Sequence, residues 1–597
     1  MTDTTLWTPR CSIQEADKIL TAPGSPLEIE TQVVDGRVLK VWKNLWPSVR
    51  ALFLYSTKEH AGKTCVVYEK ERYTFQQMSE MAVKSAAMFK DVYGVKKGDR
   101  VVICSRNLPS YYVVFWACHL LGAVTALVNA WLPLDALRHC ITLTKCTLII
   151  LDPERAEQIE PIAADLKRAS GASGYLVLED HEGKGHWEGM DVWSKVFLKY
   201  HKDPGEILRD DPHIVPEDNA TIIFTSGTTG LPKGVLSTQR AFLTFMFNLA
   251  STIGRDYIRR GVPIPSTLAS GTNNGILLPS PLFHATGTSA TLTGAFYGTK
   301  IILMRKWNVA EAVRLCKEEG VISLGGVPSL ITDLADSPLS GFSIEVITIG
   351  GAPVAPSLLR RSKEAFPHAS VGQGYGSTET NATSVGFYGP DYVAKPGSCG
   401  FVTPVNDILI MKDNVRAAPG VVGEIWLRGP NIMKGYYGDQ AATDKVLTKD
   451  GWVMTGDLGC IDEEGYVYVK DRIKDIIIRG GENIDSVSVE NALYTEPGVL
   501  EAAAVGVPDE RLGELVTALV TVKPGYRGKI SEKKLLETAR RLLPKFAVPV
   551  MIILKDGEFD HTPSGKIIKV QLRAMAQEEW VCRRKEEGRM DKAKSKL

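Results

Sequence analysis

The sequence predicts an α/β protein: a large N-terminal domain of doubly covered β-sheets with a small β-barrel-like unit, then a small α+β C-terminal domain. Short, β-branched apolar runs separated by helix-length segments predict mostly parallel sheets with helices on both faces. Between residues 408 and 468 the pattern changes to turns and alternation, which indicates the antiparallel β unit. A chain of 597 residues is too long for a single hydrophobic core, so we expect two or more domains.

The predicted parallel strands are short apolar runs in the N-terminal part of the chain. They lie at 101–104, 148–151, 221–224, 300–304 and 344–349. The apolar run at 111–134 is long enough to span a bilayer. Because His119, Gly122 and Asn129 interrupt it, we expect a buried helix leading into a buried strand, and no transmembrane segment.

A dense charged segment at 470–475 separates two strand-like runs, as linkers between domains do. We therefore place a boundary after residue 473, which gives domains at 1–473 and 474–597. The second domain alternates strand-like and helix-like stretches, for example at 502–507 and 532–543. Its tail is predicted to be a helix that fades into disorder.

Composition and charge exclude several broad classes of protein. Lys and Arg total 70 against 69 Asp and Glu, so no broad basic field attracts nucleic acid or an anionic membrane. The ten cysteines include no C-x-x-C pair and no cluster at zinc spacing, which argues against a disulfide framework or a structural metal. The N-terminus lacks the regions of a signal peptide. We expect an intracellular protein with reduced thiols, and the oligomeric state stays open.

A glycine- and hydroxyl-rich run follows the apolar run at 221–224. It reads Thr225-Ser226-Gly227-Thr228-Thr229-Gly230-Leu231-Pro232-Lys233-Gly234. The glycines let backbone N–H groups approach anionic oxygens, the hydroxyls add donors, and Lys233 supplies a positive charge. This is the chemistry of a phosphate-binding loop. A Walker A loop, and with it a P-loop NTPase or kinase, is disfavoured because Leu231 and Pro232 separate the lysine from the preceding glycine.

Several motifs in one fixed order resemble those of the adenylate-forming enzymes, the superfamily of acyl-CoA synthetases, firefly luciferase and peptide-synthetase adenylation domains. They are the phosphate loop, Gly374-Tyr375-Gly376-Ser377-Thr378-Glu379-Thr380, Thr455-Gly456-Asp457-Leu458, Asp471-Arg472-Ile473-Lys474-Asp475 with Arg479-Gly480-Gly481-Glu482-Asn483-Ile484, and Pro563-Ser564-Gly565-Lys566. The resemblance covers roughly residues 40–575. It implies an AMP-binding domain at 1–473, a mobile lid at 474–597, and a fungal-type peroxisomal acyl-CoA synthetase.

The resemblance also implies ATP, Mg²⁺ and coenzyme A as cofactors and co-substrates, and a carboxylic acid as substrate. A carboxylate is a poor acyl donor, but its mixed anhydride with AMP can be opened by a thiol. Glu379 and Thr225 are the implied Mg²⁺ ligands, and Thr378 contacts the α-phosphate. Lys566 would bridge the carboxylate and the α-phosphate, since two approaching anions need a positive charge between them.

The residues expected to hold the nucleotide or coenzyme A are Thr225, Ser226, Gly227, Thr228, Thr229, Gly230, Lys233, Gly351, Ala352, Pro353, Gly374, Tyr375, Gly376, Asp457, Arg472, Lys474, Gly480 and Gly481. Among them, Asp457 and Arg472 would contact the ribose. Lys474 matches the hinge position, where a rotation would exchange Lys566 for the 479–481 loop so that coenzyme A can enter.

Pro281-Leu282-Phe283-His284 resembles the segment beside the family's acyl pocket, so His284 is a candidate gate between the acid and coenzyme A. The pocket is expected to be lined by 284–289, 325–329 and 350–353, all rich in small residues. A medium or long fatty acid is favoured, with an aryl, branched or hydroxy acid as the alternative. A separate loop insertion is predicted at 257–274, with no assigned role.

Three other functions receive less support. An amino-acid adenylation enzyme usually has Asp where this chain has His284, and no carrier domain follows Lys566. A luciferase-like side activity stays open. A catalytically inactive scaffold is disfavoured because every charged motif residue is present.

The last three residues, Ser595-Lys596-Leu597, match the address for peroxisomal import. They predict a peroxisomal location and an import receptor as a partner.

Overall fold

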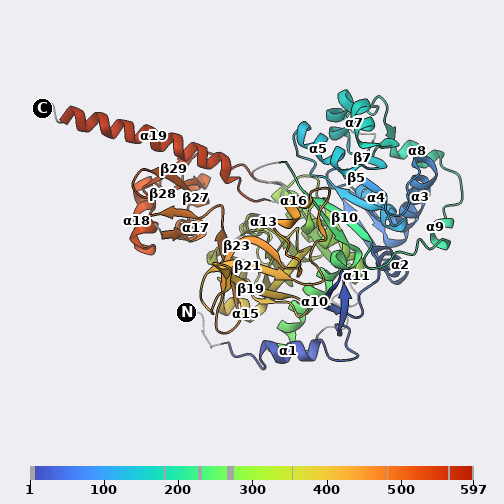
Figure 1. The fold of residues 1–597 in the computed structure, drawn as a ribbon, viewed down its shortest axis with the longest axis horizontal. Coiled ribbons are helices and arrows are strands. Elements are labelled where there is room, and N and C mark those ends of the chain that lie inside the picture. The colour runs from blue at the N-terminus through green and yellow to red at the C-terminus, as the bar shows by residue number, and fades with distance from the viewer. Residues whose placement is uncertain are drawn as a thin grey trace. The chain divides into compact units, whose positions relative to one another are not determined.

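The computed structural model describes residues 7–179, 183–225, 231–264, 274–352, 354–480, 482–562 and 565–594. The chain divides into two compact units (Figure 1). The first comprises Met1–Gly351, Ser362–Ile408 and Trp426–Thr455, and the second comprises Ala352–Arg361, Leu409–Ile425 and Gly456–Leu597. The predicted boundary after residue 473 lies in the turn that follows strand β24 (Val467–Arg472).

An eight-stranded sheet in the first unit has the strand order β22-β11-β10-β6-β5-β7-β8-β9. Its strands are β5 (Arg100–Cys104), β6 (Val124–Leu127), β7 (Leu148–Leu151), β8 (Gly174–Val177), β9 (Asp191–Val192), β10 (Asn219–Phe224), β11 (Gly234–Thr238) and β22 (Gly435–Tyr436). The strands from β10 to β9 are parallel, whereas β11 and β22 pair antiparallel at one edge. The predicted runs at 101–104, 148–151 and 221–224 are confirmed as strands.

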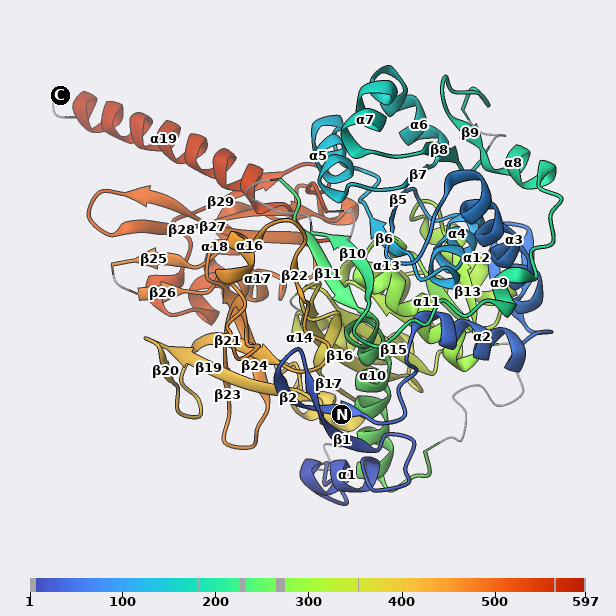
Figure 2. The same ribbon diagram turned by 45° about the vertical axis from the view of Figure 1, so that its right-hand side comes forward.

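Helices cover both faces of this sheet. Figures 1 and 2 show α3 (Phe75–Tyr93) and α4 (Pro109–Leu120) on one side of β5 and β7, with α5 (Leu134–Thr144) and α7 (Ala163–Ser170) on the other. Further helices before β12 are α1 (Ile13–Leu20), α2 (Val49–Glu59), α6 (Pro153–Ile159), α8 (Trp193–Lys199), α9 (Glu206–Arg209) and α10 (Gln239–Arg260).

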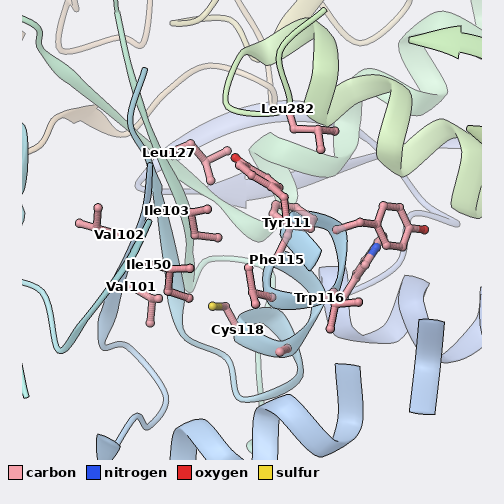
Figure 3. Packing of buried hydrophobic residues seen from close by; sticks show 14 of the residues in the cluster. Val101, Val102, Ile103, Tyr111, Phe115, Trp116, Cys118, Leu127, Ile150 and Leu282 are labelled. Atoms are coloured by element: carbon pink, nitrogen blue, oxygen red, sulfur yellow. The ribbon is translucent and has the colours of Figure 1, made fainter. Parts of the chain in front are cut away.

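The long apolar run at 111–134 forms part of this core. Every residue of α4 is buried, and Figure 3 shows Tyr111 and Phe115 of this helix among Ile103, Leu127 and Ile150 of the sheet. The run then continues into the buried strand β6, which confirms the predicted helix and strand. Within the described ranges, no helix has both the length and the apolar character needed to cross a membrane.

A second sheet in the first unit has nine strands in the order β18-β17-β16-β15-β14-β12-β13-β3-β4. These are β3 (Thr64–Tyr68), β4 (Glu71–Thr74), β12 (Gly275–Leu278), β13 (Lys300–Leu303), β14 (Val321–Gly326), β15 (Val346–Gly350), β16 (Ser370–Ser377), β17 (Ala382–Tyr388) and β18 (Phe401–Val402). The strands from β16 to β3 are parallel, and the edge strands are antiparallel. Helices α11 (Ala285–Tyr297), α12 (Val309–Glu318) and α13 (Pro328–Ala335) connect its strands.

The antiparallel unit predicted at 408–468 is confirmed as a five-stranded sheet in the order β20-β19-β21-β23-β24. Its strands besides β24 are β19 (Asp407–Lys412), β20 (Val415–Arg416), β21 (Gly423–Arg428) and β23 (Val453–Ile461). Helices α14 (Pro356–Ala365) and α15 (Gly389–Ala394) precede β16 and β18 of the nine-stranded sheet, and α16 (Gln440–Asp444) precedes β23. A separate hairpin, β1 (Ile29–Val34) and β2 (Arg37–Trp42), lies near the N-terminus.

The C-terminal part of the second unit is a small α+β structure. Its sheet contains β25 (Ile477–Arg479), β26 (Glu482–Ile484), β27 (Val499–Asp509), β28 (Gly513–Val522) and β29 (Met551–Lys555), and its helices are α17 (Ser486–Leu493), α18 (Glu532–Leu542) and α19 (Lys569–Lys594). Alternate residues of β27 face opposite sides: Ala502 packs with Val489 and Leu535, whereas Ala503 packs with Leu572. The helices α17 and α18 therefore cover one face, and α19 covers the other.

One sequence prediction is partly wrong. The segment 257–274 was expected to be a loop, but its first four residues continue α10, which ends at Arg260. Gly261 caps the helix in the left-handed conformation with φ of 67°, and Arg259 pairs with the buried Asp391. These contacts extend the helix beyond its apolar pattern. Residues 265–273 lie outside the described part of the chain.

Candidate active site

Four of the predicted substrate segments follow neighbouring strands of the nine-stranded sheet. β12, β14, β15 and β16 are parallel neighbours in that order. Residues 281–284, 325–329, 350–352 and 374–379 lie at or just beyond their carboxyl ends. In parallel sheets this edge is where ligands bind. The fold therefore brings together the predicted acyl and nucleotide segments, although they span residues 281 to 379 in sequence.

The phosphate loop connects two antiparallel neighbours in the other sheet of the same unit. Thr225 follows β10 and Lys233 precedes β11. The backbone N–H of Thr225 donates to the carbonyl of Lys233 at 2.9 Å, which closes the base of the loop. The predicted residues Ser226, Gly227, Thr228, Thr229 and Gly230 lie outside the described residues.

Glu379 lies in the turn between β16 and β17, half-buried and next to Thr378. The Thr380 hydroxyl accepts a hydrogen bond from the backbone N–H of Ser377 at 2.9 Å. The chain passes so close to itself here that a Cβ on Gly376 would lie 1.7 Å from the carbonyl oxygen of Ala382. Glycine is thus required in this motif for packing, in addition to any contact with a nucleotide.

A hydrogen-bonded network of buried asparagine side chains holds this turn in place. Asn431 donates to the carbonyl of Thr380 at 2.6 Å, and Asn381 donates to the carbonyl of Asn431 at 2.8 Å. Asn406 donates to Asn431 at 2.5 Å and accepts from Asn248 at 3.1 Å. Because buried amides are costly when unpaired, this network fixes the turn in one position. Sequence reasoning missed it, since isolated asparagines carry no periodic signal.

Tyr436 is a second residue that sequence reasoning missed. Its hydroxyl donates to Oε1 of Glu379 at 2.9 Å, and the Lys233 ammonium lies 5.0 Å from the centre of its ring. Burial, followed by the Glu379 charge, raises the pKa of Tyr436 above its ordinary value. The hydroxyl consequently stays protonated and acts as the donor. The contact spans 57 positions in sequence, so no local pattern could predict it.

In the second unit, Asp457 and Arg472 lie directly opposite each other. They are register partners in the antiparallel pair β23 and β24, and Arg472 Nε is 3.4 Å from Asp457 Oδ1. Gly456, at φ of 70°, donates its N–H to Glu424 at 3.1 Å. The two side chains predicted to contact the ribose are thus adjacent.

Lys566 lies on a tight hairpin whose base is hydrogen-bonded on both strands. The Thr562 N–H donates to the Lys566 carbonyl at 2.7 Å, and the Lys566 N–H donates to the Thr562 hydroxyl at 3.0 Å. Glu501 then anchors the incoming strand, since it accepts from His561 Nε2 at 2.5 Å and from the Phe559 N–H at 2.8 Å. The predicted motif residues Pro563 and Ser564 lie outside the described residues.

The hinge candidate Lys474 is exposed in the turn between β24 and β25. The preceding Asp471 is buried and accepts hydrogen bonds from the N–H groups of Arg472 at 2.7 Å and Ser486 at 2.5 Å. Lys569 donates to Ser486 at 2.7 Å and pairs with Glu490 at 2.6 Å. The end of β24 is therefore anchored to α17 and α19 within the second unit.

The coenzyme A loop candidate Gly480 forms the turn between β25 and β26. It has φ of 60° and donates its N–H to Leu512 at 2.7 Å. Its predicted neighbour Gly481 lies outside the described residues, as does Pro353. Pro353 was predicted to bind the nucleotide together with Gly351 and Ala352. These two residues are described and follow β15 directly.

His284 is the N-cap of α11. Its Nδ1 accepts a long hydrogen bond of 3.5 Å from the Thr286 N–H, and the side chain is half-buried. The preceding segment is held firmly, because Asn107 accepts from the Leu282 N–H at 2.8 Å and donates to the Ser280 carbonyl at 3.0 Å. Behind Leu282 the packing leaves a space too narrow for a water molecule.

Comparison with known proteins agrees with this arrangement. Residues 53–437 match the AMP-binding enzyme family, and residues 488–566 match the AMP-binding enzyme C-terminal domain. A 2-methylpropanoate–CoA ligase of Humulus lupulus is 31% identical over 543 residues, which cover 86% of this chain and 92% of that protein. A long-chain fatty-acid–CoA ligase of Mycobacterium tuberculosis is 28% identical over 508 residues, covering 84% and 93%.

Among solved structures, o-succinylbenzoate coenzyme A synthetase of Bacillus subtilis in complex with ATP and a magnesium ion aligns with a TM-score of 0.67. It is 26% identical, and the alignment covers 88% of this chain and 99% of that one. The predicted fold class, a large sheet-rich domain followed by a small α+β domain, is confirmed.

Proposed function

The chain belongs to the AMP-binding enzyme family and is an acid–thiol ligase, and we propose that it converts a carboxylic acid, ATP and coenzyme A into acyl-CoA, AMP and pyrophosphate. The acid first attacks the α-phosphate of ATP, so that an acyl adenylate forms and pyrophosphate leaves. The thiol then attacks the acyl carbon, and AMP leaves. The observation that carries this proposal is the meeting of the acyl and nucleotide segments at one sheet edge.

In the first step, Lys233 and Thr225 would hold the departing phosphates at the two ends of the phosphate loop. Thr378 would contact the α-phosphate. Lys566, on its tight hairpin, would neutralise the carboxylate and the phosphate as they approach each other.

The Glu379 carboxylate and the Thr225 hydroxyl are oxygen donors of the kind that Mg²⁺ takes. Among the described residues, no three His, Cys, Asp or Glu side chains form a metal-binding group, so the protein would supply one carboxylate and the hydroxyl of Thr225. Mg²⁺ typically takes one or two protein ligands and completes its shell with phosphate oxygens and water. The bound ion would neutralise charge on the phosphate oxygens.

Asp457 would accept hydrogen bonds from the ribose hydroxyls, and Arg472 would contact the same sugar. Their opposite positions in β23 and β24 support a shared ligand. In the second step, a rotation at Lys474 would withdraw Lys566 and present the loop with Gly480 and Gly481 to coenzyme A.

The acid is proposed to be a medium- or long-chain fatty acid. The pocket segments at 284–289 and 325–329 consist largely of small residues, and His284 would form a gate between the acid and the thiol. An aryl, branched or hydroxy acid is the second candidate. One relative is named for 2-methylpropanoate, and a solved neighbour is an o-succinylbenzoate CoA synthetase in complex with its acyl-adenylate intermediate.

We further propose a peroxisomal location of fungal type, through Ser595-Lys596-Leu597 and the import receptor. These three residues lie outside the described part of the chain. Imaging the protein with Ser595-Lys596-Leu597 at its carboxyl end and with Leu597 removed tests this address: import should be lost in the shortened form.

The ligase proposal is tested by coenzyme-A-dependent pyrophosphate release over a panel of fatty, branched, aryl and hydroxylated acids. One class should give turnover, and the acyl-CoA product should be identified by mass spectrometry. Glu379→Gln is the matched control, since it removes only the charge. The proposal fails if folded protein releases no pyrophosphate with any acid, or if the variant is as active as the natural protein.

A further inference from the structure

Tyr436 contacts two charged residues of the first unit, Glu379 and Lys233. Its hydroxyl donates to Glu379, and its ring faces the Lys233 ammonium. An ammonium over a tyrosine ring is attracted by the negative face of the ring. One side chain therefore contacts both the implied metal ligand and the implied phosphate ligand.

The backbone holds Tyr436 in this position. It pairs with Val235 of β11, the strand that leaves the phosphate loop. Its N–H donates to the Thr443 hydroxyl at 2.9 Å, and the next N–H, that of Tyr437, donates to the Gly234 carbonyl at 2.7 Å. Tyr436 is thus tied to β11 and has little freedom of its own.

The same segment also holds Glu379 at its backbone. The Met433 N–H donates to the Glu379 carbonyl at 2.8 Å, and the Tyr436 hydroxyl donates to one oxygen of the Glu379 carboxylate. A carboxylate fixed at its main chain and at one oxygen has one orientation, so the direction of the other oxygen is set before a metal arrives. Preorganisation of this kind strengthens binding because less freedom is lost.

We propose that Tyr436 is a positioning residue for the adenylation step: its hydroxyl orients Glu379 toward Mg²⁺, and its ring holds Lys233 beside the phosphates. This inference rests on the proposed function. It assigns two separable contributions to one side chain, the hydroxyl for the metal and the ring for the lysine.

The two contributions can be separated by substitution. Tyr436→Phe keeps the ring and removes the hydroxyl, whereas Tyr436→Leu removes both. Tyr437→Phe is the matched control, since it removes a hydroxyl from the adjacent, half-buried tyrosine. ATP binding is measured by calorimetry, once with Mg²⁺ and once with EDTA, and pyrophosphate release is titrated with Mg²⁺.

For Tyr436→Phe we expect ATP affinity in Mg²⁺ to fall about 10-fold, the typical effect of one hydrogen bond to a charged group, with affinity in EDTA unchanged. The Mg²⁺ concentration for half-maximal activity should rise by a similar factor. For Tyr436→Leu the affinity in EDTA should fall as well, because Lys233 loses its ring. Adding Tyr436→Phe to Glu379→Gln should change the Mg²⁺ dependence no further.

The inference is overturned if folded Tyr436→Phe matches Tyr437→Phe in Mg²⁺ dependence, or if its effect adds fully to that of Glu379→Gln. Either result leaves the proposed ligase activity intact. A natural protein that neither binds ATP more tightly in Mg²⁺ nor releases pyrophosphate would instead refute the proposed function itself.

Discussion

The ion pair between His561 and Glu501 predicts a pH-dependent stability of the hairpin that carries Lys566. The two side chains are 24% and 11% exposed and lie 2.5 Å apart. The hydrogen bond with Glu501 raises the pKa of His561 above its ordinary 6.5. A group whose pKa is raised on folding stabilises the fold fully below its unfolded pKa. That stabilisation is lost as the pH rises through the folded pKa.

The size of the effect follows from the contact. A hydrogen bond to a charged, mostly buried partner contributes about 1.5 kcal/mol, which corresponds to about a 10-fold change in an opening equilibrium. The perturbation is His561→Gln, which keeps a neutral donor and removes the positive charge. His561→Lys is the control, because its charge persists to high pH.

Hydrogen exchange of a peptide covering the hairpin measures this opening directly, since the Phe559, Thr562 and Lys566 N–H groups are all hydrogen-bonded. At about pH 6, His561→Gln should exchange about 10-fold faster than the natural protein, and by about pH 9 the two should agree within about 2-fold. His561→Lys should stay protected throughout. A ratio between natural protein and His561→Gln that does not change with pH would refute the ion-pair explanation.

Three further outcomes follow from the site. Lys566→Ala should slow adenylation from free acid and ATP at least about 100-fold, while thioester formation from synthetic acyl adenylate survives; equal loss of both would contradict the exchange of Lys566 for the 479–481 loop. Asp457→Asn should abolish the preference for ATP over 2′-deoxy-ATP in competition assays, whereas a retained preference would remove Asp457 from the ribose site. Asn431→Ala should destabilise the first unit by about 2 kcal/mol in denaturant unfolding, because it leaves the Thr380 carbonyl and the Asn406 amide buried without this partner; an unchanged midpoint would show that the network is dispensable.

The fold class and most strands could be predicted from the sequence because burial on both faces leaves a continuous apolar run. The run at 221–224 lies within β10, and the helix predicted at 532–543 is α18 within one residue. Strand ends were less predictable. The run at 502–507 is the centre of β27, which extends over Val499–Asp509, because its length depends on pairing with β28 and not on its own residues.

The site residues likewise fall into those that a local motif predicts and those that only the folded structure reveals. Glycines, hydroxyls and charges near one another in sequence, as in the phosphate loop, form a recognisable motif. The groups that hold those motifs in place come from distant segments: Tyr436 for Glu379, and Glu501 for the Lys566 hairpin, 58 positions from Phe559. Their identities as ordinary Tyr and Glu give no signal until the chain is folded.

The two units hold their site residues by different physical means, and this difference bears on the proposed mechanism. In the first unit, Glu379 is fixed by buried asparagines and by Tyr436, so moving it would break several buried hydrogen bonds. In the second unit, Lys566 is fixed within one hairpin by Thr562, and Arg472 by its partner strand. Because the Thr562 contacts lie beyond the hinge candidate Lys474, a rotation there would carry Lys566 along without breaking them, whereas Arg472, which precedes the hinge, would stay paired with Asp457. A reaction that needs one stationary metal site and one replaceable lysine is consistent with this distribution of contacts.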